Sequence, residues 1–369
     1  MNDMPSPIIA RPASRSLIGR LPLLGLAICG AALAAVAVVA SQAERPPKGS
    51  IQHGFRGTAM VYGYNPRVMD GLIDANRTPP SLPYAGNEGP KAGTVYKNVQ
   101  VLGDVSTGEF TRLMVNMTAW IAPTQGCAAC HNVANMAEDT LYTKVVARRM
   151  LEMVRHINTN WTQHVAQTGV TCYTCHRGQL VPPNVWFNDP GPNQALGASQ
   201  MPVGKNHPTP VAGGSALPLD PLTPFLEQAN NIRVLAPAAL PTDHRQSIKQ
   251  AEWTYSLMIN FSQSLGVNCT YCHNTRALAD WASSPPQRVT AWHGIRMVRD
   301  LNNAYLNPLQ SVFPPGRLGA AVGDSPKVNC ATCHNGVYKP LFGVSMAKNF
   351  PELTGTPAPA ASAQAASAQ

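Results

Sequence analysis

The longest uninterrupted apolar stretch lies near the N-terminus, where residues 21–40 contain no charged side chain. A helix of that length spans the roughly 30 Å hydrocarbon layer of a membrane. Residues 1–20 carry three arginines against one aspartate, so this flank is basic. Because basic flanks stay in the cytoplasm, we expect a cytoplasmic N-terminus over 1–20 and the rest of the chain outside the cytoplasm.

The role of residues 21–41 has three interpretations: an uncleaved transmembrane anchor, a cleaved signal or a site of lipidation. The anchor is favoured, because the apolar stretch exceeds the 7–15 residues usual in a signal peptide. Ser41-Gln42-Ala43 resembles a small-residue cleavage site. Lipidation at Cys29 is disfavoured by the bulky Ile28 before it, and a small apolar residue in a membrane helix is the simpler interpretation of Cys29.

Four later segments carry helix signals, whereas strand patterns are weak everywhere. Ser106-x-x-Glu109 forms a possible capping box at the start of the first. The second, about 141–158, contains strong helix formers throughout. The third, about 246–264, ends before Gly266, a common C-terminal signal. The fourth is expected to begin at Ser284-Pro285-Pro286-Gln287, with a serine cap and a proline at the first helical position.

Composition narrows the class of protein. Charged residues make up 13% of the chain, about half the usual share, and the 34 prolines and 29 glycines exceed the average. Apolar content of 44% permits a core and excludes collagen, coiled coil and general disorder. The formal charge of +9 would by itself suggest an acidic partner.

Eight of the nine cysteines fall into four CxxCH motifs, each of which predicts covalent attachment of one c-type haem. Two thiols one helical turn apart reach both vinyl groups of a porphyrin, and the adjacent histidine binds the iron. Structural zinc would not require a histidine after every pair, and disulfides would not explain the fourfold regularity. The cysteines are Cys127, Cys130, Cys172, Cys175, Cys269, Cys272, Cys330 and Cys333, and the histidines are His131, His176, His273 and His334.

The motifs are unevenly spaced, which indicates two pairs and an internal repeat. Leu113-Met114-Val115-Asn116 upstream of the first motif matches Leu257-Met258-Ile259-Asn260 upstream of the third. Met153-Val154-Arg155-His156 likewise matches Met297-Val298-Arg299-Asp300. We therefore predict a mainly α multihaem cytochrome c with extensive irregular loops, built as two pseudo-repeated helix–haem–helix–haem halves. Its predicted segments are an irregular 44–106, haem pair 1 and 2 in 107–186, a connecting 187–243, haem pair 3 and 4 in 244–342, and a disordered tail, 351–369.

A methionine on each upstream helix could supply the sixth iron ligand. The repeat selects Met114 for haem 1 and Met258 for haem 3, since they occupy equivalent positions. Met150 is a candidate for haem 2, and its counterpart is Gly294, which has no ligand atom. Haem 4 would then need a ligand from the first half, and both His156 and His164 remain open on this reasoning.

The strings around these residues resemble the tetrahaem cytochrome subunit of the purple-bacterial photosynthetic reaction centre. The resemblance extends from about 54 to 353 and includes the strings 145–153, 158–172, 294–301 and 339–343. It implies Met114, Met150 and Met258 as ligands of haems 1, 2 and 3, and His164 as the second ligand of haem 4. Met153 and Met297 then become core residues.

The resemblance also implies the activity and partners. Such a protein is an electron carrier and no enzyme. It re-reduces the photo-oxidised bacteriochlorophyll special pair of the reaction-centre L, M and H subunits, with haem order 3, 4, 2, 1. A soluble cytochrome c or high-potential iron–sulfur protein donates electrons at haem 1. Asp70, Asp74, Glu88 and Glu109 could dock a basic donor there.

Rival functions share some of these features. A membrane-anchored tetrahaem quinol dehydrogenase also has one anchor and four motifs, but lacks the duplicated methionine helices. A multihaem reductase needs an open iron position, whereas all four haems here have a credible sixth ligand.

Arg288, Arg296 and Arg299 could pair with haem propionates. The negative charge of the propionates offsets most of the +9, so the charge is no evidence for nucleic acid.

Overall fold

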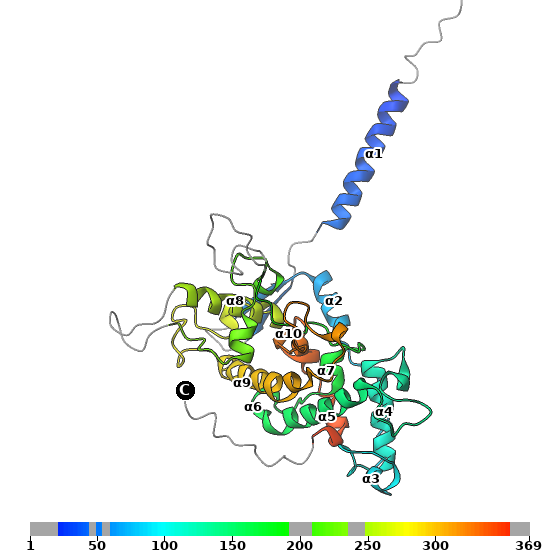
Figure 1. Cartoon of the computed structure of the whole chain (residues 1–369). Helices are drawn as coiled ribbons and strands as arrows, with labels where there is room; N and C mark the ends of the chain where they lie inside the picture. The colour runs from blue at the N-terminus through cyan, green and yellow to red at the C-terminus, as the bar shows by residue number, and fades with distance from the viewer. Residues whose placement is uncertain (1–20, 44–48, 54–59, 192–208, 235–247, 355–369) are drawn as a thin grey trace, which may run out of the picture. The chain divides into compact units, whose positions relative to one another are not determined.

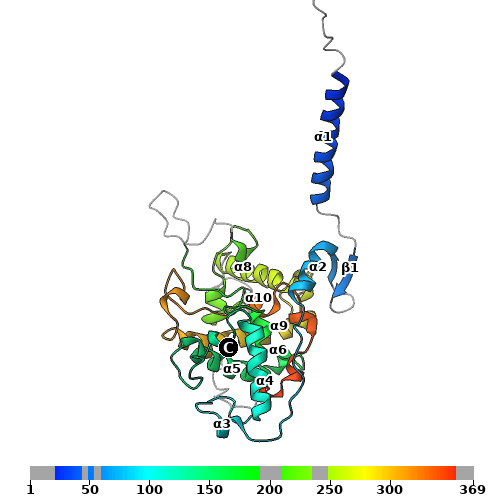
Figure 2. The same cartoon turned by 90° about the vertical axis from the view of Figure 1, so that its right-hand side faces the viewer.

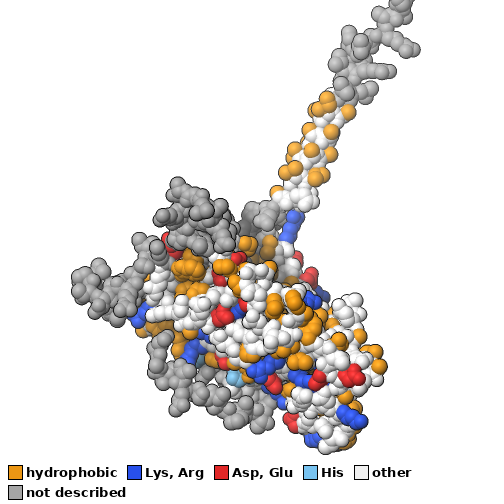
Figure 3. All heavy atoms as spheres, in the orientation of Figure 1, with side chains coloured by type: hydrophobic (Ala, Val, Ile, Leu, Met, Phe, Trp, Pro, Cys, Tyr) orange, Lys and Arg blue, Asp and Glu red, His pale blue; other side chains and the backbone are white. Residues whose placement is uncertain are grey.

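The computed structural model describes residues 21–43, 49–53, 60–191, 209–234 and 248–354 (Figure 1). The chain divides into two compact units, one of residues 1–49 and 63–66 and the other of residues 50–62 and 67–369. The first contains α1 (Leu21–Gln42), whose described side chains are exposed and largely apolar (Figure 3). In the described part of the chain, α1 alone is long and apolar enough to cross a membrane. The predicted apolar helix is therefore confirmed, and anchorage stays a prediction.

The second unit is mostly helical, as the sequence predicts, with short helices and irregular chain between the longer ones. In two views at right angles, α10 lies beside α8, and the two elements are in contact (Figure 2). The remaining elements are α2 (Pro66–Ala75), α3 (Ala92–Val95), α4 (Thr107–Ile121), α5 (Tyr142–Asn160), α6 (Thr162–Val165), α7 (Cys172–His176), α8 (Ile248–Leu265), α9 (Gln287–Asp300), α10 (Cys330–His334), β1 (Gly49–His53) and β2 (Met60–Tyr64).

Most predicted helix boundaries are confirmed. Ser106 is the N-cap of α4, and its hydroxyl accepts a hydrogen bond from the Glu109 amide at 3.3 Å. Helix α8 ends before Gly266, whose φ of +62° is a conformation that glycine adopts without strain. Helix α5 covers the predicted 141–158 within two residues at each end.

The expected start of the fourth helix is wrong. Helix α9 begins at Gln287, with Pro286 before it, and has no side-chain cap. The Ser284 hydroxyl instead donates to the Asp280 carbonyl at 2.6 Å and accepts from Arg288 at 2.7 Å. The serine is thus used by the preceding turn, where it contacts Asp280 and Arg288, and does not cap α9.

Four further elements, all in the segment 44–106 that was expected to be irregular, were not predicted from the sequence. Strands β1 and β2 pair into a two-stranded sheet, although strand patterns are weak everywhere. Helices α2 and α3 lie in the same segment. These elements are short, and their hydrophobic patterns are correspondingly brief.

The expectation of a tail that is disordered from residue 351 is wrong for its first residues. Phe350 and Leu353 are fully buried, and the ring of Phe350 meets Trp120 edge to face at a centroid distance of 4.7 Å. Arg155 on α5 donates to the Glu352 carbonyl at 2.8 Å. These contacts fix the chain as far as 354, and 355–369 lie outside the described residues.

A buried charge cluster joins this C-terminal segment to α4. Arg112 lies 2.7 Å from Glu109 and 3.7 Å from Glu352, and the three side chains are at most 4% exposed. Glu109 therefore cannot belong to a docking surface, contrary to expectation. Burial, together with the charge of Glu109, raises the pKa of Glu352 to about 7 against the opposing effect of Arg112.

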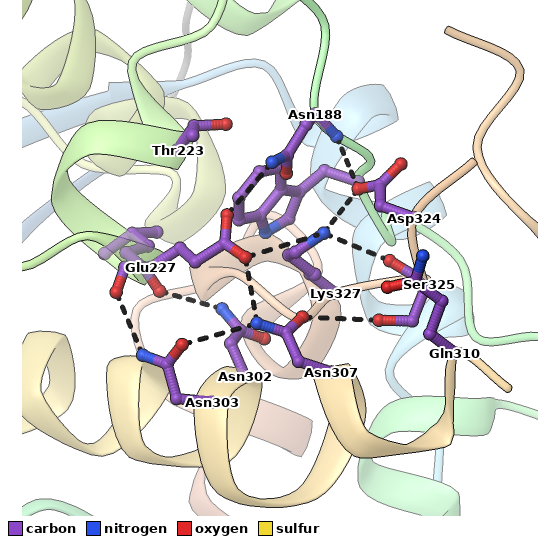
Figure 4. Close-up of polar contacts among 12 residues, drawn as sticks. Asn188, Thr223, Glu227, Asn302, Asn303, Asn307, Gln310, Asp324, Ser325 and Lys327 are labelled. Atoms are coloured by element: carbon purple, nitrogen blue, oxygen red, sulfur yellow. Dashed lines mark hydrogen bonds and ion pairs between the residues drawn. The ribbon is translucent and has the colours of Figure 1, made fainter. Parts of the chain in front are cut away.

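A second buried network surrounds Lys327, whose side chain is 1% exposed (Figure 4). Its ammonium group pairs with Asp324 and lies 4.0 Å from Glu227. Asn188 contacts both acids. Its backbone amide donates to Asp324 at 2.8 Å, and its side-chain amide donates to Glu227 at 3.1 Å. Asn302, Asn303 and Asn307 extend the network to the helical turn after α9. The network fixes the segment that leads into the fourth CxxCH motif.

We predict that Lys327→Ala lowers the free energy of unfolding by about 3 kcal/mol, because it leaves buried carboxylates without their cation. Denaturant unfolding of the haem-loaded protein measures the change. The matched control is Arg77→Ala, which breaks an ion pair whose side chains are 74% and 71% exposed. The control should cost less than about 1 kcal/mol. Equal costs for the two variants would contradict the role of the network.

Glu352 makes stability depend on pH. Its pKa is about 7 in the folded protein and lower when unfolded, so the native state binds more protons between these values. Stability is therefore greatest below the unfolded pKa and falls as pH rises toward 7 and just beyond. Glu352→Gln should flatten this part of a plot of unfolding free energy against pH. A wild-type protein that gained stability over that interval relative to the variant would disprove the assignment.

Candidate haem-binding sites

The four CxxCH motifs adopt two local conformations. The first and third lie at short 3₁₀ turns, η2 (Gly126–Ala129) and η5 (Cys269–Tyr271). The second and fourth form one-turn α-helices, α7 and α10. Motifs in the same position of the predicted repeat thus share the same backbone.

The two helical motifs also begin and end in the same way. Each starts with a capping box, formed by Thr171 with Thr174 in α7 and by Asn329 with Thr332 in α10. Each ends at a residue in the left-handed backbone conformation, Arg177 or Asn335, which is followed by a glycine with positive φ. After α7, the amide of this glycine donates to the Trp120 carbonyl of α4. After α10, the amide of the corresponding glycine donates to the Ser264 carbonyl of α8.

All four motif histidines make the same kind of contact through Nδ1. The Nδ1 atom of each lies 2.9–3.1 Å from a carbonyl oxygen. Because a carbonyl only accepts, the proton sits on Nδ1 and Nε2 keeps its lone pair for a metal. The pairs are His131 with Met136, His176 with Gln179, His273 with Leu278, and His334 with Val337.

The electrostatic surroundings favour neutral imidazoles. Burial lowers the pKa of His176 and of His273. Burial, and then the neighbouring His164, lower the pKa of His334 to about 4. Burial also raises the pKa of Cys172 and of Cys330 to about 12. These groups are uncharged at neutral pH, as expected beside an apolar cofactor.

The fourth motif faces a histidine from the other half of the chain. The rings of His164 on α6 and His334 on α10 have centroids 6.1 Å apart. The His164 Nδ1 lies 2.9 Å from the Thr290 carbonyl of α9, so its Nε2 is also free to bind a metal. A Cβ on Gly294 would lie 2.5 Å from His164 Cε1, so only glycine leaves room for the ring. His156, the alternative from the sequence, instead pairs with Asp300 at 2.6 Å.

A cavity of about 3230 Å³ joins the third and fourth motifs. Small-molecule pockets usually measure roughly 300–1,000 Å³, so there is room for more than one large cofactor. Among its lining residues are both cysteines and the histidine of each of these two motifs, together with His164 and Met258. Arg288, Arg296 and Arg299 also line it, which places them where propionates could be paired.

The candidate methionine ligands are half-buried at the edge of the core. They are Met114 on α4, Met150 on α5 and Met258 on α8. Met153 and Met297 are instead buried within the core, 6% and 5% exposed, although Met297 also borders the cavity. Met117 on α4 is also half-buried, so the choice of these three methionines as ligands rests on the repeat and on the family resemblance.

The two helical motifs touch each other. The Sγ atoms of Cys175 and Cys333, the second cysteines of the two motifs, lie 3.1 Å apart. The Arg177 side chain after α7 donates to the Cys333 carbonyl at 3.2 Å. Helix α5 contacts the segments of both the first and the second motif. Thr143 near its start donates to the Ala129 carbonyl at 2.6 Å, and Asn158 near its end donates to the carbonyl of Val170, just before Cys172, at 2.9 Å.

The donor set fits haem. Two imidazoles that bind one metal from opposite sides, with bonds of about 2.0 Å, have ring centroids roughly 6 Å apart. The separation of His164 and His334 matches that distance. Within the described residues, no group of three or more His, Cys, Asp or Glu side chains could hold a metal ion.

The sequence did not single out the residues that hold α6 in place. Trp161, which precedes α6, donates from its indole nitrogen to Asp300 at 2.9 Å. The signal available was the repeat itself, which aligns His156 with Asp300 and so places complementary groups at matching positions.

Known proteins match this chain over most of its length. The family model of the photosynthetic reaction centre cytochrome c subunit matches residues 44–354. The subunit of that name from Rubrivivax gelatinosus is 50% identical over 352 residues, covering 95% of this chain and 93% of its own. The one from Thermochromatium tepidum is 53% identical over 328 residues, covering 88% and 80%. The one from Roseobacter denitrificans is 41% identical, covering 92% and 94%.

We predict that Gly294→Ala displaces the His164 ring and costs about 1–3 kcal/mol of unfolding free energy through overpacking. Gly71→Ala in α2 is the control, because a Cβ there meets nothing within 4 Å. It should be neutral or stabilising by about 0.5–1 kcal/mol. Thermal unfolding of both variants distinguishes them, and an undisturbed Gly294→Ala protein would show that His164 does not need this space.

Proposed function

Because the chain belongs to the family of photosynthetic reaction centre cytochrome c subunits, it is an electron-transfer protein of photosynthesis that carries covalently bound haem c, and we propose its finer roles as follows. It holds four haems, one at each CxxCH motif. It re-reduces the photo-oxidised bacteriochlorophyll special pair of the L, M and H subunits. Its electrons come from a soluble cytochrome c or a high-potential iron–sulfur protein, and it catalyses no bond chemistry.

Each iron has two protein ligands in this proposal. His131 pairs with Met114, His176 with Met150, His273 with Met258, and His334 with His164. When bound, each haem supplies a one-electron Fe(III)/Fe(II) couple. The observation that carries the proposal is the pair His164 and His334, whose ring centroids lie 6.1 Å apart and whose Nδ1 atoms each lie within hydrogen-bond distance of a backbone carbonyl.

Contacts between the sites support the order 3, 4, 2, 1. Sites 3 and 4 share one cavity. Sites 4 and 2 meet where Cys333 approaches Cys175. Sites 2 and 1 both adjoin α5, which donates to the Ala129 carbonyl of the first motif through Thr143 and to the Val170 carbonyl before the second through Asn158. Each site therefore adjoins the next, as sequential electron transfer requires.

The proposed repeat of 107–186 and 244–342 is supported by paired contacts between equivalent residues. His156 pairs with Asp300, its counterpart, and Cys175 lies against Cys333, its counterpart. In an isologous interface, a patch contacts its own copy in this way. The halves would then be related by an approximate twofold axis that passes between these pairs.

The protein's side chains would set the potential of each site. A thioether ligand raises a haem potential relative to a second imidazole. Site 4, with two histidines, should therefore be among the lower-potential sites. The arginines along the cavity, Arg288, Arg296 and Arg299, would offset propionate charge.

We also propose that α1 is an uncleaved anchor and that the haem-binding part lies on the periplasmic face. The length and apolar surface of α1 support the first point, and the basic residues 1–20 support the second. Asp70, Asp74 and Glu88 remain proposed contacts for a donor, and lipidation at Cys29 is the alternative form of anchorage.

His164→Met tests the ligand set. It should raise one of the four potentials, by a part of the roughly 0.8 V range over which axial ligands set haem potentials, because a thioether replaces an imidazole. Redox titration of purified protein measures this. His156→Met is the control and should leave the ligand set unchanged. Four unchanged potentials in His164→Met would refute the assignment, and a haem count other than four per chain would refute the cofactor number.

A further inference from the structure

We propose that Asp300 is a positioning residue for the fourth haem site, which holds His164 in place through Trp161 and keeps His156 away from the iron. The proposal rests on the proposed function, in which His164 is a ligand. It assigns a role to a half-buried polar cluster that the ligand set itself does not use.

The ligand stands on an element that cannot hold it alone. Helix α6 has four residues, and so short a helix has little stability of its own. Outside contacts must therefore fix the His164 ring. An iron ligand needs such support, because small displacements weaken the bond and change the potential.

Asp300 supplies the first contact. Its Oδ2 accepts a hydrogen bond from the Trp161 indole at 2.9 Å. The Trp161 carbonyl in turn accepts from the His164 amide at 2.9 Å and from the Val165 amide at 3.0 Å. Asp300 therefore holds Trp161, the residue at the start of the turn on which His164 lies.

The second contact lies on the same helix. Thr290 accepts from His164 Nδ1, and Gly294 provides the flat surface under the ring. Thr290, Gly294 and Asp300 all lie on α9. Asp300 is about 15 Å from Thr290 along the helix axis. Two attachments this far apart on one rigid helix fix both the position and the rotation of α6.

The same carboxylate controls the competing histidine. His156 Nε2 lies 2.6 Å from Asp300 Oδ2, and His156 lines the same cavity as His164. Its Nδ1 is 3.1 Å from Asn160. Both ring nitrogens of His156 are therefore engaged, and His164 is left as the histidine available to the iron.

The carboxylate is suited to this task. Burial would raise the pKa of Asp300, but hydrogen bonds from His156 and Trp161 outweigh it and leave the pKa below its usual value. Asp300 therefore stays ionised at neutral pH. Hydrogen bonds to a charged acceptor are stronger than neutral ones.

We call the hydrogen bonds of Asp300 with Trp161 and His156 the clamp. Three variants of the full-length haem protein test it. Asp300→Ala removes the acceptor, and Trp161→Phe removes only the donor. Asp300→Asn keeps an oxygen that can accept from both neighbours. Asp139→Ala is the control, since Asp139 also accepts from side chains, those of Arg148 and Asn98. Electron paramagnetic resonance of the oxidised protein and carbon monoxide binding to the reduced protein report the ligands of haem 4.

In Asp300→Ala and Trp161→Phe, the bis-imidazole signal should become heterogeneous. The fraction of haem that binds carbon monoxide should rise about tenfold or more, as loss of a charge-assisted hydrogen bond allows. Asp300→Asn should restore most of the wild-type signal, and Asp139→Ala should match wild type. If Asp300→Ala fails to load haem, Trp161→Phe decides the question.

The clamp and the ligand set fail in different ways. If the wild-type signal is present and is lost in His164→Met, but is unchanged in both Asp300→Ala and Trp161→Phe, the clamp is overturned and the ligand set stands. If the wild-type protein has no bis-imidazole haem, both are overturned.

Discussion

The geometry around the fourth CxxCH motif depends on one constraint, the placement of His164 opposite His334. The two residues come from different halves of the sequence, so their rings meet only if α6 crosses onto α9. Gly294 leaves room for the ring, and the Thr290 carbonyl fixes its orientation. Because the crossing joins the halves, the ligands of one site become part of the packing that holds the whole unit together.

In the proposed repeat, the two halves differ in this region in complementary ways. Where the first half has Met150, the second has Gly294, and the absence of a side chain leaves the space that His164 fills. Where the first half has His156, the second has Asp300, and the two form a pair. Each difference between the copies is thus complementary to a group from the other copy. In our account, divergence of the repeat made the two halves dependent on each other.

The sequence predicted the parts of this arrangement that depend on local chemistry. The CxxCH motifs, the Ser106 cap and the end of α8 at Gly266 all follow from short patterns, and the structure has each of them. Contacts between distant segments were not predictable in this way. Glu109 reads as a surface acid but is buried against Arg112, and Lys327 gains its partners from segments about 100 residues away or more as well as from Asp324 nearby. The choice between His156 and His164 needed a family resemblance, since both lie at plausible distances along the chain.

The central claim is that this chain delivers electrons directly to a photo-oxidised pigment in the membrane. Flash spectroscopy of isolated photosynthetic membranes tests it most directly, with absorbance followed at the haem α-band after a single flash and no added carrier. Our account predicts haem oxidation within microseconds, in step with re-reduction of the bacteriochlorophyll pair. Re-reduction that proceeds without any haem oxidation, or only after a soluble carrier is added, would contradict it.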